Sequence, residues 1–308
     1  MAKKFIVTII AVMLGVGALR AEEFLIGRMI FSPRPAALGG AYAGLSNDLA
    51  ALEYNPAGLA FIKKPQISGG MVLWYNETAA NSFSAAFSIK KRLGIGLLYN
   101  FFNISDTART GDNTTITEIG DIGYKTSVLT LAFGYELKIV RGLMEGVAIK
   151  MFSEGLTLPG NWQYQAADEF SVSALAFDYG IIYLNRDTGE SFGLSLQNLG
   201  QSSAKLPSIA RLGGSQRVGQ FSLLWEVDYQ GLNNFSENIL SANRLKYGVG
   251  LEYKLLPEVI LRGGLKYQRY LDGTLGLGLS YKNFYLDYCF IPQIDLGAEQ
   301  RMSFTVKF

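Results

Sequence analysis

The stretch Lys246–Leu255 reads KYGVGLEYKL, and its apolar and polar side chains alternate along the chain. Val249 and Leu251 fall on one face of an extended backbone, whereas Gly250 and Glu252 fall on the other. Successive side chains of a β-strand point to opposite faces, so this period of two predicts a strand with one apolar and one polar face. The fold depends on whether the apolar face contacts lipid or a second sheet.

The same alternation recurs in Phe221–Tyr229, Leu275–Tyr281 and Arg301–Phe308. A membrane barrel turns such an apolar face to lipid and keeps a polar lumen, whereas a soluble sandwich buries it against a second sheet. Tyr, Phe and Trp are dense on these apolar faces, and such residues form the interfacial girdles of membrane barrels. We therefore predict an all-β transmembrane barrel, with a large soluble all-β protein as the alternative.

The alternation places fourteen antiparallel strands between residues 65 and 308, an even number as single-chain bacterial barrels require. Most run close to the 9 to 11 residues that a tilted strand needs to cross the apolar band. The predicted strands are 66–75, 81–90, 93–103, 124–137, 144–156, 170–184, 190–199, 207–215, 219–229, 243–255, 258–269, 273–282, 283–291 and 299–308.

The predicted connections alternate between short and long, as outer-membrane barrels alternate periplasmic turns with outer loops. Residues 104–123 would form the longest outer loop, and its charged and threonine side chains make it too polar for an apolar funnel. Trp162 and Tyr164 in one outer loop, and Phe235 and Ile239 in another, are the candidate contacts at the outer rim.

Residues 1–21 have the order of a secretory signal peptide: two lysines, an apolar run from Phe5 to Leu19, and a small residue at Ala21. The run is too short to span a bilayer comfortably, although an uncleaved anchor is the alternative. Export through this signal places the barrel in the bacterial outer membrane. The mature chain is close to neutral, which gives no basic field for nucleic acid.

Glycine is frequent, at 35 of 308 residues, and ten glycines fall on the predicted lumen face. Residues without a side chain there leave room for something inside the barrel. These glycines are Gly94, Gly96, Gly134, Gly180, Gly193, Gly248, Gly250, Gly264, Gly276 and Gly278.

Residues 22–64 are predicted to be what fills that room. The stretch 36–60 is rich in alanine and glycine, lacks lysine and arginine, and does not alternate. Ser46, Asn47 or Asp48 could cap a short helix that runs to about Tyr54. Pro56 would end that helix by forcing the preceding residue out of the helical region. We expect this segment to form a small hatch inside the barrel.

The stretch ALGGAYA at 37–43, followed by NPAGLA at 55–60, resembles the N-terminal signature of the PorV/PorQ family of outer-membrane proteins. That family is related to FadL-type long-chain fatty acid transporters. The last hairpin, from Tyr288 to the terminal Phe308, also looks like that family. The resemblance implies a fourteen-stranded barrel with an N-terminal hatch, and an Asn-Pro-Ala element that positions the hatch.

By this resemblance the hatch residues are Asn55, Pro56, Ala57 and Gly58. The same four residues would also make an ordinary helix stop and turn. A structural role is the first interpretation, and gating would follow from it.

Enzymatic chemistry is poorly supported, because the chain has no histidine and one cysteine, Cys289. A Ser/His or Cys/His pair cannot be assembled, and no metal or cofactor site is indicated. Charged residues on the lumen face should form ion pairs rather than acid/base pairs. These lumen-facing charges are Glu226, Lys246, Glu252, Arg262, Lys266 and Arg301.

Two functions follow from the predicted barrel and the family resemblance. The first is transport of hydrophobic small molecules past the hatch, with outer-membrane lipid and the ligand as partners. The alternative is a non-enzymatic platform that holds secreted protein cargo at the outer membrane, as in type IX secretion. The sequence leaves both open.

Overall fold

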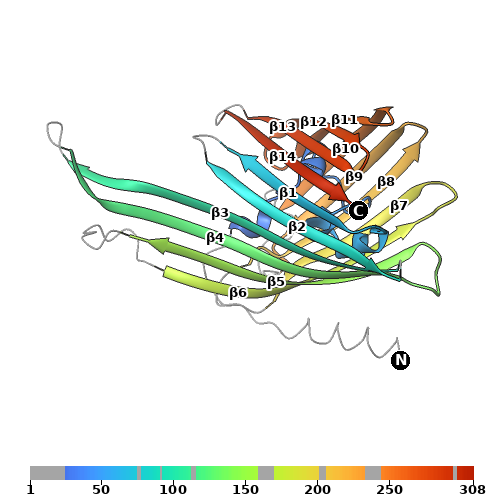
Figure 1. Cartoon of the computed structure of the whole chain (residues 1–308), viewed down its shortest axis with the longest axis horizontal. Helices are drawn as coiled ribbons and strands as arrows, with labels where there is room; N and C mark the ends of the chain where they lie inside the picture. The colour runs from blue at the N-terminus through green and yellow to red at the C-terminus, as the bar shows by residue number, and fades with distance from the viewer. Residues whose placement is uncertain are drawn as a thin grey trace.

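The computed structural model describes residues 25–74, 78–90, 92–111, 116–158, 170–200, 206–232, 244–293 and 297–308. Within these residues, fourteen antiparallel strands close into one barrel (Figure 1), and β1 (Gln66–Leu73) pairs with β14 (Gly297–Lys307). The even strand number and the closure without a free edge are those of bacterial outer-membrane barrels. The predicted all-β barrel is confirmed, and the predicted signal peptide at 1–21 lies outside the described residues.

The twelve strands between them follow chain order. They are β2 (Ala79–Ile89), β3 (Leu93–Gly111), β4 (Ile116–Glu136), β5 (Leu143–Thr157), β6 (Phe170–Leu184), β7 (Glu190–Leu199), β8 (Ile209–Val218), β9 (Phe221–Gln230), β10 (Leu245–Leu256), β11 (Val259–Tyr267), β12 (Leu271–Tyr281) and β13 (Phe284–Gln293). Four short helices precede β1: η1 (Leu25–Arg28), α2 (Pro33–Ala37), α3 (Ala51–Tyr54) and η2 (Pro56–Phe61). No helix among the described residues is long and apolar enough to cross a membrane.

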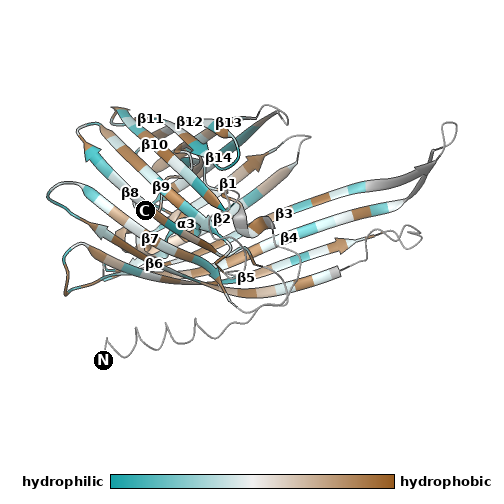
Figure 2. Cartoon of the chain, turned by 180° about the vertical axis from the view of Figure 1, so that it is seen from behind, coloured by the Kyte–Doolittle hydropathy of each residue, from teal (hydrophilic) through white to brown (hydrophobic). Residues whose placement is uncertain are grey.

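Strand β10 has the two faces that its sequence predicts. Val249 is 51% exposed on the outside, whereas Glu252 is 6% exposed in the lumen. Brown and teal residues alternate along the strands in the same way in Figure 2. The outer surface therefore presents apolar side chains where a soluble protein would place polar ones, as a lipid-facing barrel requires.

Tight links gather at one end of the barrel. The link between β8 and β9 consists of Gly219 and Gln220, and the link between β12 and β13 consists of Lys282 and Asn283. Gly219 has φ of 60°, a backbone conformation that glycine adopts at no steric cost. Phe308, the last residue, lies at the same end, where its amide donates to the carbonyl of Pro65. Short turns mark the periplasmic side of such barrels.

The strands differ greatly in length, and one predicted loop is wrong. β3 has 19 residues and β4 has 21, against 8 in β1. The segment 104–123 was predicted to be a loop, but its described residues belong to these two strands: β3 runs to Gly111, which pairs with Ile116 at the start of β4. With β5 and β6 they project beyond the rest of the barrel as an extended wall (Figure 1).

Candidate functional site

The N-terminal segment from Leu25 to Lys64 lies inside the barrel (Figure 1). Helix α2 packs on β11 to β14, and η2 packs on β3 to β6. Their small side chains are buried: Ala37, Ala57 and Leu59 have no exposed surface. The hydrophobic core of the protein therefore lies in the lumen of the barrel.

Glycines on the lumen face of the strands allow this segment to approach the wall. A Cβ atom at Gly180 would overlap the side chain of Asn55, and one at Gly94 would overlap the carbonyl of Leu59. Gly278 differs, because a Cβ there would meet the side chains of Arg262 and Asp287. The glycines that face the segment directly are Gly94, Gly96, Gly134, Gly146, Gly180, Gly193, Gly213, Gly248, Gly250, Gly264 and Gly276.

Asn55 is fully buried and ties the segment to two strands. Its side-chain amide donates to the carbonyls of Ala43, Ile181 and Leu194 at 3.1 to 3.3 Å. Its Oδ1 accepts from the amide of Ala57 and so caps η2. One side chain thus satisfies groups of the segment, β6 and β7 together.

The other predicted hatch residues lie in η2, a helical turn that the sequence analysis did not foresee. Pro56 begins it, and Asn55 has the extended backbone that a residue before proline prefers. Gly58 lies so close to the carbonyl of Ser46 that a Cβ atom would overlap it. Helix α3 ends at Tyr54 as expected, and Asp48 accepts from the amide of Ala50 just before it.

Charged residues of β8, β9 and β10 form a buried cluster against the segment. Arg211 pairs with Glu226 at 3.2 Å and with Asp228 at 2.8 Å, and Lys246 lies 3.5 Å from Asp228. Glu226 also accepts from the backbone amides of Tyr42 and Ala43 at 2.7 and 2.6 Å. The predicted charges Glu226 and Lys246 therefore lie in one cluster with Arg211, and Glu226 also holds the segment.

A second charge cluster joins the segment to β10, β11 and β13. Arg34 of α2 donates to both oxygens of Glu252, and its guanidinium also pairs with Asp48 at 2.8 Å. Arg262 lies between Glu252 and Asp287. Burial by itself would raise the pKa of Asp48, but the Arg34 guanidinium overrides it and holds that pKa below its usual value.

The remaining predicted charges, Lys266 and Arg301, lie apart from these clusters. Lys266 pairs with Asp272 at 3.4 Å on the half-exposed upper part of the lumen. Arg301 contacts Glu299 and donates to the carbonyl of Ile30 in the segment. Pairing between strand neighbours is the arrangement that a polar barrel interior favours.

Glu53, in α3, fixes the stretch that enters α2. Its carboxylate accepts from the amides of Phe31 and Ser32 at 3.0 to 3.3 Å, and from the side chain of Asn100 on β3. Burial raises the pKa of the Glu53 carboxyl above its usual value, although these donors favour the charged form. We call Phe31, Ser32, Glu53 and Asn100 the clamp.

Apolar side chains fill the lumen on the outer side of the clamp. Ile26, Phe31, Phe102 and Phe152 are among the residues of this outer cluster, and Phe31 is buried in it. Partly buried side chains continue it upward: Trp74 meets Phe102 edge-to-face at 5.5 Å, and Phe102 meets Tyr124 at 6.2 Å. The full outer cluster is Ile26, Phe31, Val72, Ala80, Phe102, Val128, Phe152, Ala176 and Leu206.

The alternation of β3 to β6 changes sense where these strands project above the barrel. Below, the outward residues are apolar, such as Leu97 and Leu129; above, they are polar. The outward polar residues are Asn103, Lys125, Ser127, Ser153, Ser171 and Ser173. The inward residues are mostly apolar (Ile104, Ile122, Tyr124, Leu156 and Val172), with Asp106, Thr126 and Glu154 among them. Ile104 is 40% exposed, so the wall presents an accessible apolar inner face.

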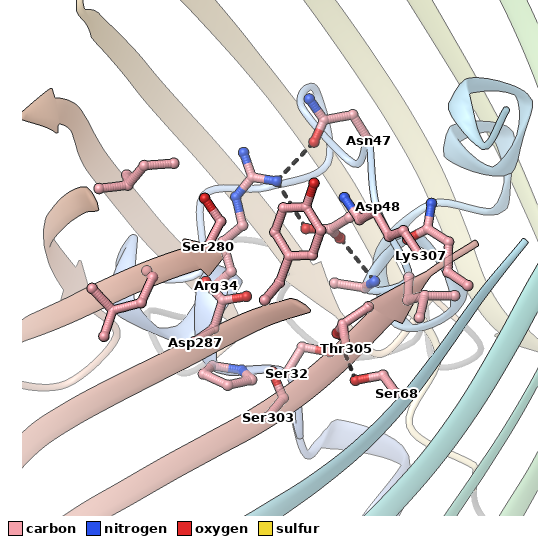
Figure 3. Close-up of a pocket in the computed structure, with 18 of the residues that line it drawn as sticks. Ser32, Arg34, Asn47, Asp48, Ser68, Ser280, Asp287, Ser303, Thr305 and Lys307 are labelled. Carbon is pink, nitrogen blue, oxygen red and sulfur yellow. Dashed lines mark hydrogen bonds and ion pairs between the residues drawn. The ribbon is translucent and has the colours of Figure 1, made fainter. Parts of the chain in front are cut away.

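On the periplasmic side of the clamp, the lumen holds a polar pocket of about 440 Å³ (Figure 3). The segment contributes Ser32, Arg34, Asn47 and Asp48 to one side. Residues of β10, β11 and β12, such as Lys254, Ile260 and Leu279, line a second side. The third side belongs to β13, β14, β1 and β2, which we call the serine arc. Its pocket-lining residues are Gln66, Ser68, Ser82, Ser84, Tyr285, Asp287, Ser303, Thr305 and Lys307.

No family model and no curated protein matches the chain. Solved structures do match. The toluene transporter TbuX of Ralstonia pickettii is similar with a TM-score of 0.65 and 14% identity, over 90% of this chain and 98% of that one. The toluene transporter TodX of P. putida has a TM-score of 0.61 and 12% identity over 89% and 97%. A Pseudomonas aeruginosa FadL homologue has a TM-score of 0.56 and 12% sequence identity, over 90% of this chain and 98% of that one.

The fold is of the FadL type. At these identities the likeness shows architecture, and that architecture fits a bacterial outer-membrane protein. Two of these structures are named as toluene transporters.

Four predicted outer-rim residues, Trp162, Tyr164, Phe235 and Ile239, lie outside the described residues. Three functional side chains were missed: Arg34, Glu53 and Arg211. Arg211 alternates with the exposed Leu212, so the period-two pattern of β8 was sufficient to place it in the lumen. No such pattern could place Arg34 and Glu53, because the segment that contains them has no regular alternation of apolar and polar residues.

Proposed function

We propose that this protein transports small hydrophobic molecules across the outer membrane, with residues 25–64 as the hatch. The accessible apolar inner face of the β3 to β6 wall, with the outer cluster at its foot, is the observation that carries this proposal. A side chain such as Ile104 gains nothing by facing water, so its inward exposure suits an apolar ligand. The FadL-type fold, shared with structures named as toluene transporters, supports the same class of solute.

The hatch role rests on how firmly the segment is held. Asn55 of the segment binds carbonyls of β6 and β7, and Glu226 of β9 binds the segment's backbone amides. The glycines of the wall let the segment approach it closely. In this proposal Asn55, Pro56, Ala57 and Gly58 anchor the hatch rather than contact the solute. The lumen charges Glu252, Lys246 and Arg262 keep it aligned through their ion pairs.

Uptake of labelled toluene by bacterial cells that lack FadL-type transporters of their own tests the proposal. Cells that express the protein should take up toluene faster than cells with an empty vector. Phe102→Ser should slow uptake, because it places a hydroxyl in the outer cluster. Phe101→Ser is the matched control, because Phe101 precedes it on the outer face and stacks on Tyr99. Equal uptake with and without the protein would reject transport of this class.

The PorV/PorQ resemblance of residues 37–60 keeps a secretion-platform role as the competing proposal. The projecting wall of β3 to β6 favours it, because such a wall also offers a surface to a protein (Figure 1). Cross-linking in intact cells, followed by mass spectrometry, separates the two. Secreted proteins that share one C-terminal domain would support the platform, and the barrel recovered alone would support transport.

A further inference from the structure

The serine arc is the part of the wall that the hatch does not seal. Around β3 to β8 and β10 to β12, the hatch backbone lies against glycines. On β1, a Cβ at Gly70 would meet Ser82 and Ser303 rather than the hatch. The polar pocket of about 440 Å³ occupies this place and extends along β11 and β12 to Ile260 and Leu279. Its volume is within the range of small-molecule binding sites.

The pocket reaches the periplasmic end of the barrel. Pro257 and Glu258, which form the tight link between β10 and β11, line it, and so does Lys307 at the end of β14. Lys307 lies over the ring of Tyr285 at 4.0 Å, within the pocket. The compartment therefore offers polar groups, beside apolar ones such as Ile260 and Leu279, at the side where a transported molecule must leave.

The serine arc also contributes to the outer cluster, at a point nearer the outer end of the barrel. Ala80 belongs to the outer cluster, and Ser82, two residues along β2, lines the pocket. Two residues of a strand span about 7 Å. Leu98 of β3 borders both the pocket and a void of about 30 Å³ above it, the room of roughly one water molecule. Only the clamp stands between the apolar and the polar compartment.

The wall of the serine arc offers no sideways exit. The pairings of β13 with β14, β14 with β1, and β1 with β2 and β2 with β3 run without a register shift. Within the described residues, shifts occur elsewhere, at Ala108/Arg109, Phe177/Tyr179 and Lys254/Leu256. A solute that passes the clamp therefore meets a continuous strand wall and an opening toward the periplasm.

We infer that the polar pocket is the exit compartment of the transport route and that solutes leave through it into periplasmic water. This inference rests on the proposed transport function. It also narrows the solute class to small molecules with an apolar body and one hydroxyl or carboxyl group, such as simple phenols. The apolar body of such a solute would pack against the outer cluster. Its hydroxyl or carboxyl group would replace water at Ser84, Ser303 or Lys307.

Thiol labelling tests whether the pocket opens to the periplasm. The protein's one cysteine, Cys289, is buried, so the unaltered protein serves as the unlabelled control. With the protein reconstituted in vesicles, a charged methanethiosulfonate on the periplasmic side should label Ser303→Cys. It should leave the neighbouring Phe304→Cys, on the lipid face, unlabelled. Added 4-methylphenol should slow labelling of Ser303→Cys. Absence of labelling, or labelling that 4-methylphenol does not affect, would overturn the inference.

Transport through the pocket is tested with a bulky side chain. Ser84→Trp should lower 4-methylphenol uptake about tenfold, whereas Phe83→Trp, on the lipid face of the same strand, should leave it unchanged. Ser303→Trp repeats the test from the other side of the arc. If the unaltered protein does not take up the phenol at all, the proposed function fails. If it does, and both Ser84→Trp and Ser303→Trp transport normally, the exit lies elsewhere.

Discussion

The barrel has two arcs that treat the hatch differently. On the glycine arc, β3 to β8 and β10 to β12, strand backbones touch the hatch because the lumen residues have no side chains. On the serine arc, short hydroxyl side chains stand in the same position and a pocket remains. Both arcs have the same strand pairing and the same apolar outer face. One barrel thus combines close contact with the hatch on one arc and a pocket beside the hatch on the other.

The largest expected effect is on the charge cluster of the glycine arc. Arg211→Leu should lower the free energy of unfolding by about 3 to 5 kcal/mol, because it removes the cation paired with the buried Glu226 and leaves Asp228 with Lys246 only. Urea unfolding in detergent micelles, followed by tryptophan fluorescence, measures the change. Arg217→Leu in the same strand, at its exposed periplasmic end, is the control and should cost little. Equal losses would mean that the cluster does not hold the hatch.

Charged substitutions on the lipid-facing side should destabilise the two arcs equally. Leu251→Arg on the glycine arc and Phe83→Arg on the serine arc place a charge in lipid, and each should cost about 2 to 4 kcal/mol if it lies near the bilayer midplane. Folding into lipid vesicles, read as the mobility shift of the folded barrel on gels, measures both. A loss for only one of the two would show that the arcs differ outside as well as inside.

A matched pair of glycines tests the seal directly. Gly180→Ala should cost about 1 to 3 kcal/mol, because its Cβ would overlap the Asn55 side chain that three carbonyls hold in place. Gly70→Ala on the serine arc should cost less, since its closest contact is the rotatable hydroxyl of Ser82 and the nearest backbone atom, the Met302 carbonyl oxygen, lies at 3.3 Å. The two unfolding curves can be compared under one condition. If Gly70→Ala is the more damaging, the assignment of seal and passage is reversed.

The smallest effect concerns pH and the clamp between the two compartments. The folded-state pKa of Glu53 is raised, so its contribution to stability is present below the unfolded pKa of about 4.3 and is lost as pH rises through the folded value. Unaltered protein should therefore lose stability relative to Glu53→Gln as pH is raised from 4 to 8. Parallel curves for the two proteins would show that Glu53 does not titrate in this range.

Sequence patterns predicted the barrel because lipid imposes a strict period of two on every strand. Val249 and Glu252 fall on the faces that their positions require, and the same holds for Leu212 and Arg211. The pattern failed at 104–123 for a physical reason. There the strands leave the lipid and the apolar side changes from outer to inner face, so a broken alternation was mistaken for the end of a strand.

The sequence predicted the presence of the hatch from its amino-acid composition, but it did not predict how the hatch folds. Its alanines and glycines, and the Asn-Pro step, indicate a compact segment with a helix stop. Its contacts join residues far apart in the chain, such as Arg34 with Glu252 and Glu53 with Asn100. No local rule predicts such pairs, because they exist only after the barrel has closed around the segment.

By itself the sequence determined that the chain forms strands with one apolar and one polar face, since burial in lipid acts on each residue locally. It also determined that histidine chemistry is absent. Only the tertiary structure decided which glycines meet the hatch, which serines border a pocket, and where the clamp separates apolar from polar space. These depend on closure of β1 onto β14, which brings both ends of the barrel sequence to one wall.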